Sequence, residues 1–157
     1  MKLFYHCFGG AHTSITCAAI HLGYLPMDRV PGSQEFNSVP YYDKMEDKNC
    51  GTPIYLGRDE LGIDIYAIGL KNACHIMIPA IKSYLNTNDI QSKDLLFVES
   101  LVKLHPITGI GGFLSRKLHL VSIGRPLTVW GIRRRYGVFV EIVSRVKESL
   151  SGDIGIS

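Results

Sequence analysis

Apolar residues divide the start of the chain into a β-prone run, a glycine turn and a helix. The run KLFYHC spans residues 2–7, and Gly9 and Gly10 follow it. We expect the helix to end at Gly23, which can adopt the left-handed conformation common after a helix. Pro26 then prevents the helix from continuing. The helical part has apolar residues at i, i+3, i+4 and i+7, which form one face of a helix: Ile15, Ala18, Ala19 and Leu22. An opening of strand, glycine turn and helix is common to many α/β folds.

The middle of the chain predicts a hairpin, a helix and a strand. Two β-prone runs within residues 53–70 flank a polar turn with glycines, which indicates an antiparallel hairpin near a sheet edge. Residues 72–86 have helical spacing, and because proline is costly inside a helix, we expect this helix to begin near Pro79 or to kink there. Residues 94–99, DLLFVE, form a nearly continuous apolar run that is typical of a buried parallel strand.

The rest of the chain continues the alternation. Residues 107–118 have helical spacing, residues 126–131 (PLTVWG) predict a strand, and a period of four over residues 134–150 predicts a long final helix. The order predicts a three-layer α/β sandwich with a mainly parallel sheet and one antiparallel hairpin. Its opening is like that of phosphate-loop or Rossmann-like folds.

Residues 27–52 are the exception, because they hold prolines, glycines and scattered charges without a sustained period. A long irregular segment in a compact domain is often a lid or a binding loop, so we expect residues 27–52 to be lid-like. The length of 157 residues suits one domain, and we expect residues 1–157 to form a single α/β domain.

Composition argues against three classes of protein: disordered, membrane-spanning and secreted disulfide-rich proteins. The chain is 46% apolar and 20% charged with a net charge of +3, which excludes a disordered protein. No run of 18 apolar residues is present, so we expect no membrane partner. Four cysteines lie far apart without a CxxC pair, which indicates a reduced, cytoplasmic protein and not a secreted disulfide scaffold: Cys7, Cys17, Cys50 and Cys74.

Positive charge is concentrated near the end of the chain. Residues 1–115 carry 9 basic and 11 acidic side chains, whereas residues 116–157 carry 8 and 3. The run Arg133-Arg134-Arg135 suits nucleic acid, acidic lipid or a phosphate. Because aromatic residues are not interleaved with it and no nucleic-acid module is recognisable, a solvated helix start is favoured and nucleic acid is not an expected partner.

The candidate chemistry lies between the first strand and the first helix. In open α/β sheets, ligands bind beyond the carboxyl ends of the strands. Two glycines there let the backbone approach a ligand closely, and the helix directs its free N–H groups and positive dipole end at the same place. The sequence therefore predicts a phosphate site on consecutive residues: Gly9, Gly10, Ala11, His12, Thr13 and Ser14. The alternative is a glycine turn with a satisfied polar cap.

The loop fits the phosphate-loop pattern GxxxxGK[ST] only in part. His6 and Ala11 replace its two glycines and His12 replaces its lysine, whereas Thr13 keeps the hydroxyl that holds magnesium in that motif. Glu99 ends an apolar strand, as does the acid that supports the metal in phosphate-loop enzymes. If the phosphorylated ligand brings Mg²⁺ as a cofactor, we expect Glu99 to hold it. The missing lysine argues against triphosphate hydrolysis.

Cys7 suggests a second kind of chemistry. A cysteine at a strand end that faces a helix N-terminus is suited to act as a nucleophile, with His12 as base. The loop of cysteine phosphatases has an arginine six residues after its cysteine, where this chain has Thr13, so a structural thiol is the alternative. His12, Cys7 and Glu99 are thus the catalytic candidates. No pair of His or Cys residues has the spacing of a structural zinc site, so no metal centre is predicted.

A second glycine cluster, Gly109-Ile110-Gly111-Gly112, follows the strand that ends at Glu99. Each glycine in a helical turn costs about 1 kcal/mol relative to alanine, which indicates a close approach by another helix or by a ligand. Arg116 and Arg125 are the charges best placed along the sequence to complete an anion site at the first loop.

Several long motifs resemble those of one family: YHCFGGAHTSITCAAIHLGYLP, LGRDELGIDIYAIG, and IGGFLSRKL followed by IGRPLTVWGI. The chain is similar to a family of small proteins from spore-forming Firmicutes, known as domain of unknown function 3189. The resemblance covers nearly the whole chain and implies a bacterial cytosolic protein. It implies no activity, cofactor or catalytic residue.

These observations predict an α/β protein that binds a phosphate-containing ligand, a nucleotide or a sugar phosphate, at the loop of residues 9–14. They leave open whether a reaction follows. The alternative from another class is a non-catalytic interaction or regulatory module, which the missing lysine favours. The polar loop beside a helix start favours the first function.

Overall fold

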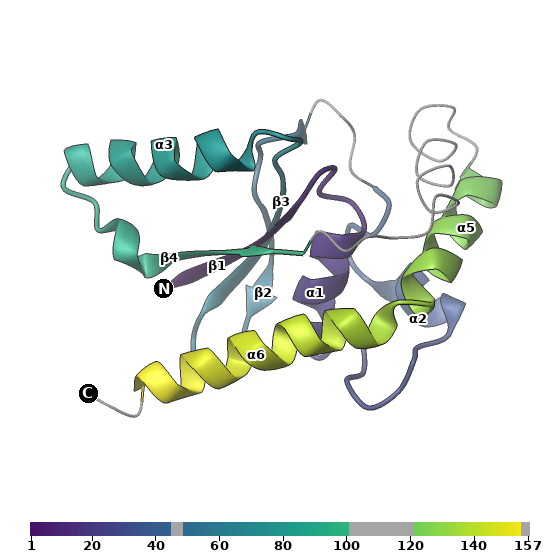
Figure 1. The fold of residues 1–157 in the computed structure, drawn as a ribbon. Helices are drawn as coiled ribbons and strands as arrows, with labels where there is room; N and C mark the ends of the chain where they lie inside the picture. Colours follow the sequence, from purple (N-terminus) through teal and green to yellow (C-terminus); the bar gives the residue numbers. More distant parts are fainter. Residues whose placement is uncertain (45–48, 101–120, 155–157) are drawn as a thin grey trace.

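The computed structural model describes residues 1–44, 49–100 and 121–154 (Figure 1). Its centre is a four-stranded sheet in the order β2-β3-β1-β4. β1 runs parallel to both β3 and β4, whereas β2 is antiparallel to β3. The structure therefore confirms the mainly parallel sheet with one antiparallel hairpin. The strand bounds are Lys2–Cys7 for β1, Ile54–Arg58 for β2, Asp64–Gly69 for β3 and Leu95–Glu99 for β4.

Helices lie on both sides of this sheet, with α3 on one side and α1 and α6 on the other (Figure 1). The helix bounds are Thr13–His21 for α1, Ser33–Ser38 for α2, Cys74–Thr87 for α3, Val121–Arg133 for α5 and Tyr136–Ile154 for α6, with a short 3₁₀ helix η2 at Ser92–Asp94. Within the described ranges, no helix is both long and apolar enough to cross a membrane.

The two sides of the sheet differ in how much apolar surface they bury. Leu3 and Tyr5 of β1 point into the larger core, where every residue of α1 is buried. Phe4, the residue between them, belongs to a smaller cluster with Ile68 and side chains of α3. The alternation follows from the period of two in a strand. β1 is thus held from both sides, while α3 has no buried residue.

The predicted strand at residues 126–131 is wrong, because these residues lie inside α5. The segment has β-branched and aromatic side chains, which favour a strand locally. In the fold, however, Val129 and Ile132 are buried three residues apart on one side of a helix. Burial of that helical face outweighs both the local preference and the cost of Pro126.

Two further expectations met a different outcome. The helix expected at residues 72–86 is present as α3, but it begins at Cys74 and continues past Pro79, so the alternative of a start at the proline is wrong. β4 confirms the parallel strand within residues 94–99, but it is half-buried and not buried, since it pairs with β1 on one edge. The helix expected at residues 107–118 lies outside the described residues.

The turn after β1 packs backbone against backbone on the end of β3. Gly10 has a φ of +71°, and a Cβ there would lie 2.6 Å from the backbone nitrogen of Gly69. A Cβ on Gly69 would in turn lie 2.7 Å from the carbonyl carbon of Gly9. Both contacts are closer than atoms tolerate, so each position requires glycine.

We expect Gly10→Ala to lower the free energy of unfolding by at least about 3 kcal/mol, because it combines a left-handed φ with a steric clash. Gly62→Ala is the matched control: its φ is +76°, and no heavy atom lies within 4 Å of an added Cβ. It should cost only about 1 kcal/mol. Urea unfolding of both variants measures the difference, and equal losses would contradict the close packing.

Candidate functional site

The loop between β1 and α1 folds around the thiol of Cys7. The backbone N–H of Gly10 donates a hydrogen bond to Cys7 Sγ at 3.1 Å, and Ser14 Oγ lies 3.2 Å from the same sulfur. Backbone bonds from Leu70 N to Cys7 O and from Lys71 N to Phe8 O fasten the loop to the end of β3. Cys7 is a buried residue, 7% exposed as a whole. It therefore sits inside the turn, next to the first residues of the helix.

The start of α1 is buried but has no cap. His12 occupies the N-cap position without a side-chain cap hydrogen bond, and the first turn holds no acidic residue. Ala11, Thr13 and Ser14 are buried, yet the backbone N–H groups from Ala11 to Ser14 have no hydrogen-bond partner within the described part of the chain. Buried donors at the positive end of a helix dipole are what an anion needs.

Asp43 connects this loop to a helix from a distant part of the chain. His12 Nε2–H donates to Asp43 Oδ1 at 2.8 Å, and Arg125 Nε–H of α5 donates to Asp43 Oδ2 at 3.4 Å. The N–H of Asp43 also donates to Ala11 O at 3.0 Å. Asp43 adopts a left-handed φ of 56°, which lets its backbone and its carboxylate reach the loop together.

In this cluster the acidic side chain is buried, while the two donor side chains, those of His12 and Arg125, are partly exposed. The Asp43 side chain is fully buried, whereas those of His12 and Arg125 are 14% and 28% exposed. Arg125 uses Nε for Asp43, and its two terminal nitrogens have no hydrogen-bond partner among residues 1–44, 49–100 and 121–154. A guanidinium anchored in this way can offer those two donors to a carboxylate or phosphate in a planar fork.

The structure brings together some of the residues singled out from the sequence. Cys7, Arg125 and the loop of residues 9–14 converge. Glu99 does not join them: it pairs in register with His6, so its exposed side chain shares the sheet face opposite that of Cys7. Arg116 lies outside the described residues. Asp43 was missed because an acidic residue in the irregular segment 27–52 gives no periodic or motif signal.

A family model described as protein of unknown function, DUF3189, matches residues 2–148. The chain belongs to this family. No curated protein and no solved structure matched the DUF3189 chain. The residues matched include β1, its loop, Asp43 and Arg125, so the candidate site lies within the family domain.

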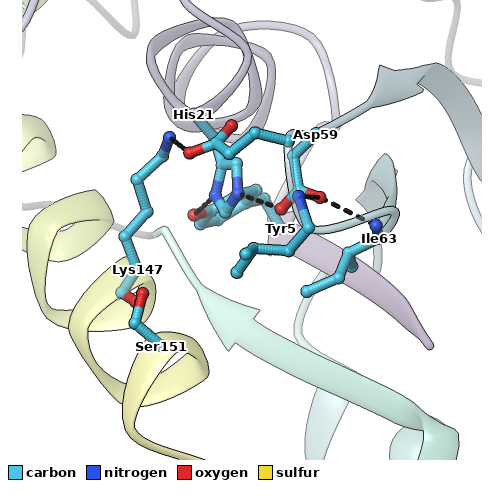
Figure 2. Close-up of polar contacts among 8 residues, drawn as sticks. Tyr5, His21, Asp59, Ile63, Lys147 and Ser151 are labelled. Atoms are coloured by element: carbon cyan, nitrogen blue, oxygen red, sulfur yellow. Dashed lines mark hydrogen bonds and ion pairs between the residues drawn. The ribbon is translucent and has the colours of Figure 1, made fainter. Parts of the chain in front are cut away.

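A second polar cluster of this DUF3189 chain lies at the other end of α1 (Figure 2). Tyr5 O–H donates to His21 Nδ1 at 2.9 Å, and His21 Nε2–H donates to Asp59 Oδ2 at 3.0 Å. Asp59 Oδ1 accepts the N–H groups of Leu61 and Ile63, which holds the hairpin turn. The side chains of His21 and Asp59 are 0% and 1% exposed, so the cluster is structural and not a ligand site.

One cavity of the described structure lies away from both clusters. It has a volume of about 550 Å³ and lies at the amino ends of β1 and β4, lined by Met1, Lys2, Leu85, Ile90, Gln91, Asp94 and Leu95. The candidate loop is at the carboxyl end of β1, the end at which α/β sheets bind ligands. Among the described residues, no three His, Cys, Asp or Glu side chains are grouped so that they could hold a metal ion.

The buried histidines make a testable prediction about pH. Burial lowers the pKa of His21, against the opposing effect of its bond to Asp59, and burial also lowers the pKa of His6. Below about pH 6.5 the unfolded chain therefore binds more protons than the folded chain, so the free energy of unfolding should decrease as pH falls.

Urea unfolding at about pH 7.5, 6.5 and 5.5 measures this slope. His21→Gln and His6→Gln should each remove part of it. A stability that stays constant over this range, or that rises as pH falls, would contradict the buried neutral histidines.

Proposed function

We propose that the protein binds a phosphate-containing ligand, such as a nucleotide or a sugar phosphate, at the loop of residues 9–14. The observation that carries the proposal is Arg125, a partly buried guanidinium tied through Asp43 to His12 at the uncapped start of α1. Backbone donors, one arginine fork and the dipole end of a helix then converge on one anion.

The charge balance supports an anion over a neutral ligand. The fully buried carboxylate of Asp43 bonds both His12 and Arg125, whose side chains are the partly exposed members of the cluster. The N–H groups at the start of α1 add partial positive charge. A phosphate contributes negative charge and several acceptor oxygens, and in that way satisfies N–H groups that have no partner among the described residues.

A non-catalytic interaction module is the second candidate function, and α3 favours it. Ile76 and Tyr84 on its outer side are 63% and 69% exposed, and Lys82 is its single charged residue. Large apolar side chains exposed together on one helix are often covered by a partner. Binding through α3 would leave the loop without a ligand, so a test of anion binding separates the two candidates.

A thermal-shift panel of inorganic phosphate, nucleotides and sugar phosphates, with and without magnesium, tests the proposed function. A ligand at 100 times its Kd adds roughly 2.7 kcal/mol to stability, which for a chain of this length raises the Tm by about 5–10 °C. We expect such a shift with at least one phosphorylated compound and none with an uncharged analogue. A flat response to every anion would favour the interaction module.

Arg125→Ala should weaken binding of the stabilising anion about tenfold to a hundredfold, because it removes a charged pair of donors. The matched control is Arg145→Ala, since Arg145 is 75% exposed and pairs with Glu141 on the outside of α6. The control should bind normally. Isothermal titration calorimetry gives both affinities, and an equal effect of the two substitutions would rule out a direct role for Arg125.

A further inference from the structure

We propose that Cys7 is a nucleophile and that the protein hydrolyses phosphate monoesters through a phosphocysteine intermediate. This inference rests on the proposed function, because it places the phosphoryl group of the ligand in the same loop. It adds a reaction, a substrate class and a catalytic residue.

The thiol lies between the glycine turn and the start of α1. Cys7 Sγ accepts the Gly10 N–H at 3.1 Å and lies 3.2 Å from Ser14 Oγ, the hydroxyl of the second residue of α1. Both groups can donate to a thiolate and stabilise it as nucleophile and as leaving group. The sulfur is thus beside the buried N–H groups that would hold the phosphoryl oxygens.

Observations independent of the thiol indicate a ligand at this place. Arg125 is held by Asp43 with both terminal nitrogens unpartnered in the described part of the molecule, although its side chain is largely buried. Thr13, at the start of α1, is 5% exposed, and its hydroxyl also has no hydrogen-bond partner among the described residues. Neither the Thr13 hydroxyl nor the terminal nitrogens of Arg125 are fully enclosed, so these donors reach the surface from largely buried side chains, where a bound group with several acceptors can meet both.

The number of donors favours a phosphoryl over an acyl substrate. A thioester-forming enzyme stabilises one developing oxyanion, for which about two N–H donors suffice. Here the N–H groups from Ala11 to Ser14 and the Arg125 fork all lack a hydrogen-bond partner within residues 1–44, 49–100 and 121–154. A transferring phosphoryl group presents three oxygens that share negative charge, and it therefore matches this larger set.

The reaction balances with groups that the site contains and with water. The Cys7 thiolate attacks phosphorus, an S–P bond forms, and the P–O bond to the alcohol breaks. The leaving oxygen takes a proton from the His12 imidazolium, whose charge Asp43 stabilises through the 2.8 Å bond. Water then attacks phosphorus and gives its proton to His12, while the S–P bond breaks to release inorganic phosphate and restore the thiolate.

The other cysteines provide matched controls. Cys50 and Cys74 are both more exposed than Cys7, and neither belongs to residues 9–14. Cys74 is the cleaner control, because Gly51, the neighbour of Cys50, donates to the carbonyl oxygen of Gly69 next to the loop. Cys17 is fully buried, and burial raises the pKa of its thiol well above the usual value, so it is inert. Accessibility alone therefore predicts faster alkylation of Cys50 and Cys74, whereas the proposal predicts faster alkylation of Cys7.

The first experiment compares the rates at which iodoacetamide modifies each cysteine, measured by peptide mass spectrometry. We expect Cys7 to react at least about tenfold faster than Cys50 and Cys74, and inorganic phosphate to slow only Cys7. If Cys7 reacts more slowly than both controls, the assignment of Cys7 as the nucleophile is wrong. Rapid alkylation that phosphate does not slow would overturn the placement of the phosphoryl group on the thiol.

The second experiment measures hydrolysis of p-nitrophenyl phosphate and traps the intermediate by acid quench and intact-mass analysis. Cys7→Ser should lower the rate at least about a thousandfold and abolish the phosphorylated species, while Cys74→Ser keeps both. Because serine retains an acceptor for Gly10 N–H, the variant should still fold and bind inorganic phosphate, which calorimetry verifies. Should Cys7→Ser fail to fold, the alkylation ranking in the unmodified chain decides.

The results distinguish this inference from the proposed function. Binding of inorganic phosphate without hydrolysis or a phosphorylated intermediate leaves the anion site in place and overturns the role of Cys7. No binding of any phosphate overturns both. Hydrolysis that persists in Cys7→Ser contradicts the phosphocysteine mechanism but is consistent with the proposed anion site at residues 9–14.

Discussion

The backbone contact between Gly10 and Gly69 is the constraint on which the candidate site depends. It brings the turn after β1 against the end of β3, so that the chain reverses directly into α1. The reversal places the Cys7 thiol beside the N–H of Gly10 and the first residues of the helix. A side chain at either glycine would separate the turn from the sheet, and with it the buried start of α1 from the thiol.

Asp43 then joins segments that are far apart along the chain. Its carboxylate is fully buried, so it needs cationic or donor partners, and it receives them from His12 and Arg125. The same residue satisfies Ala11 O through its backbone. The buried carboxylate of Asp43 thus orients both the His12 imidazole and the Arg125 guanidinium. The partly exposed side chains of the cluster are those of His12 and Arg125, which both donate hydrogen bonds.

Local patterns predicted the parts of this structure that short stretches of chain determine. The β1 strand, the glycine turn, α1 and the hairpin follow from periods and turn residues within a few positions. The strand expected at residues 126–131 failed because long-range burial of Val129 and Ile132 decided its conformation. The candidate loop could be proposed from the sequence because its residues are consecutive. Asp43 could not, because its hydrogen bond to His12 joins residues that are 31 positions apart. Arg125 was proposed for its charge, but only the fold shows Asp43 anchoring it.

α1 is fastened to β1 at both of its ends, and this explains how a buried helix start can remain uncapped. At its first turn, the Ser14 hydroxyl lies within hydrogen-bond distance of the Cys7 thiol. At its last turn, His21 accepts a hydrogen bond from the Tyr5 hydroxyl and donates one to Asp59 of the hairpin turn. Every residue of α1 is buried between these contacts. The helix is therefore positioned by packing and by its C-terminal polar network, so its N-terminal donors are not required for stability. Among the described residues these donors have no hydrogen-bond partner, and the proposed anion site is built on them.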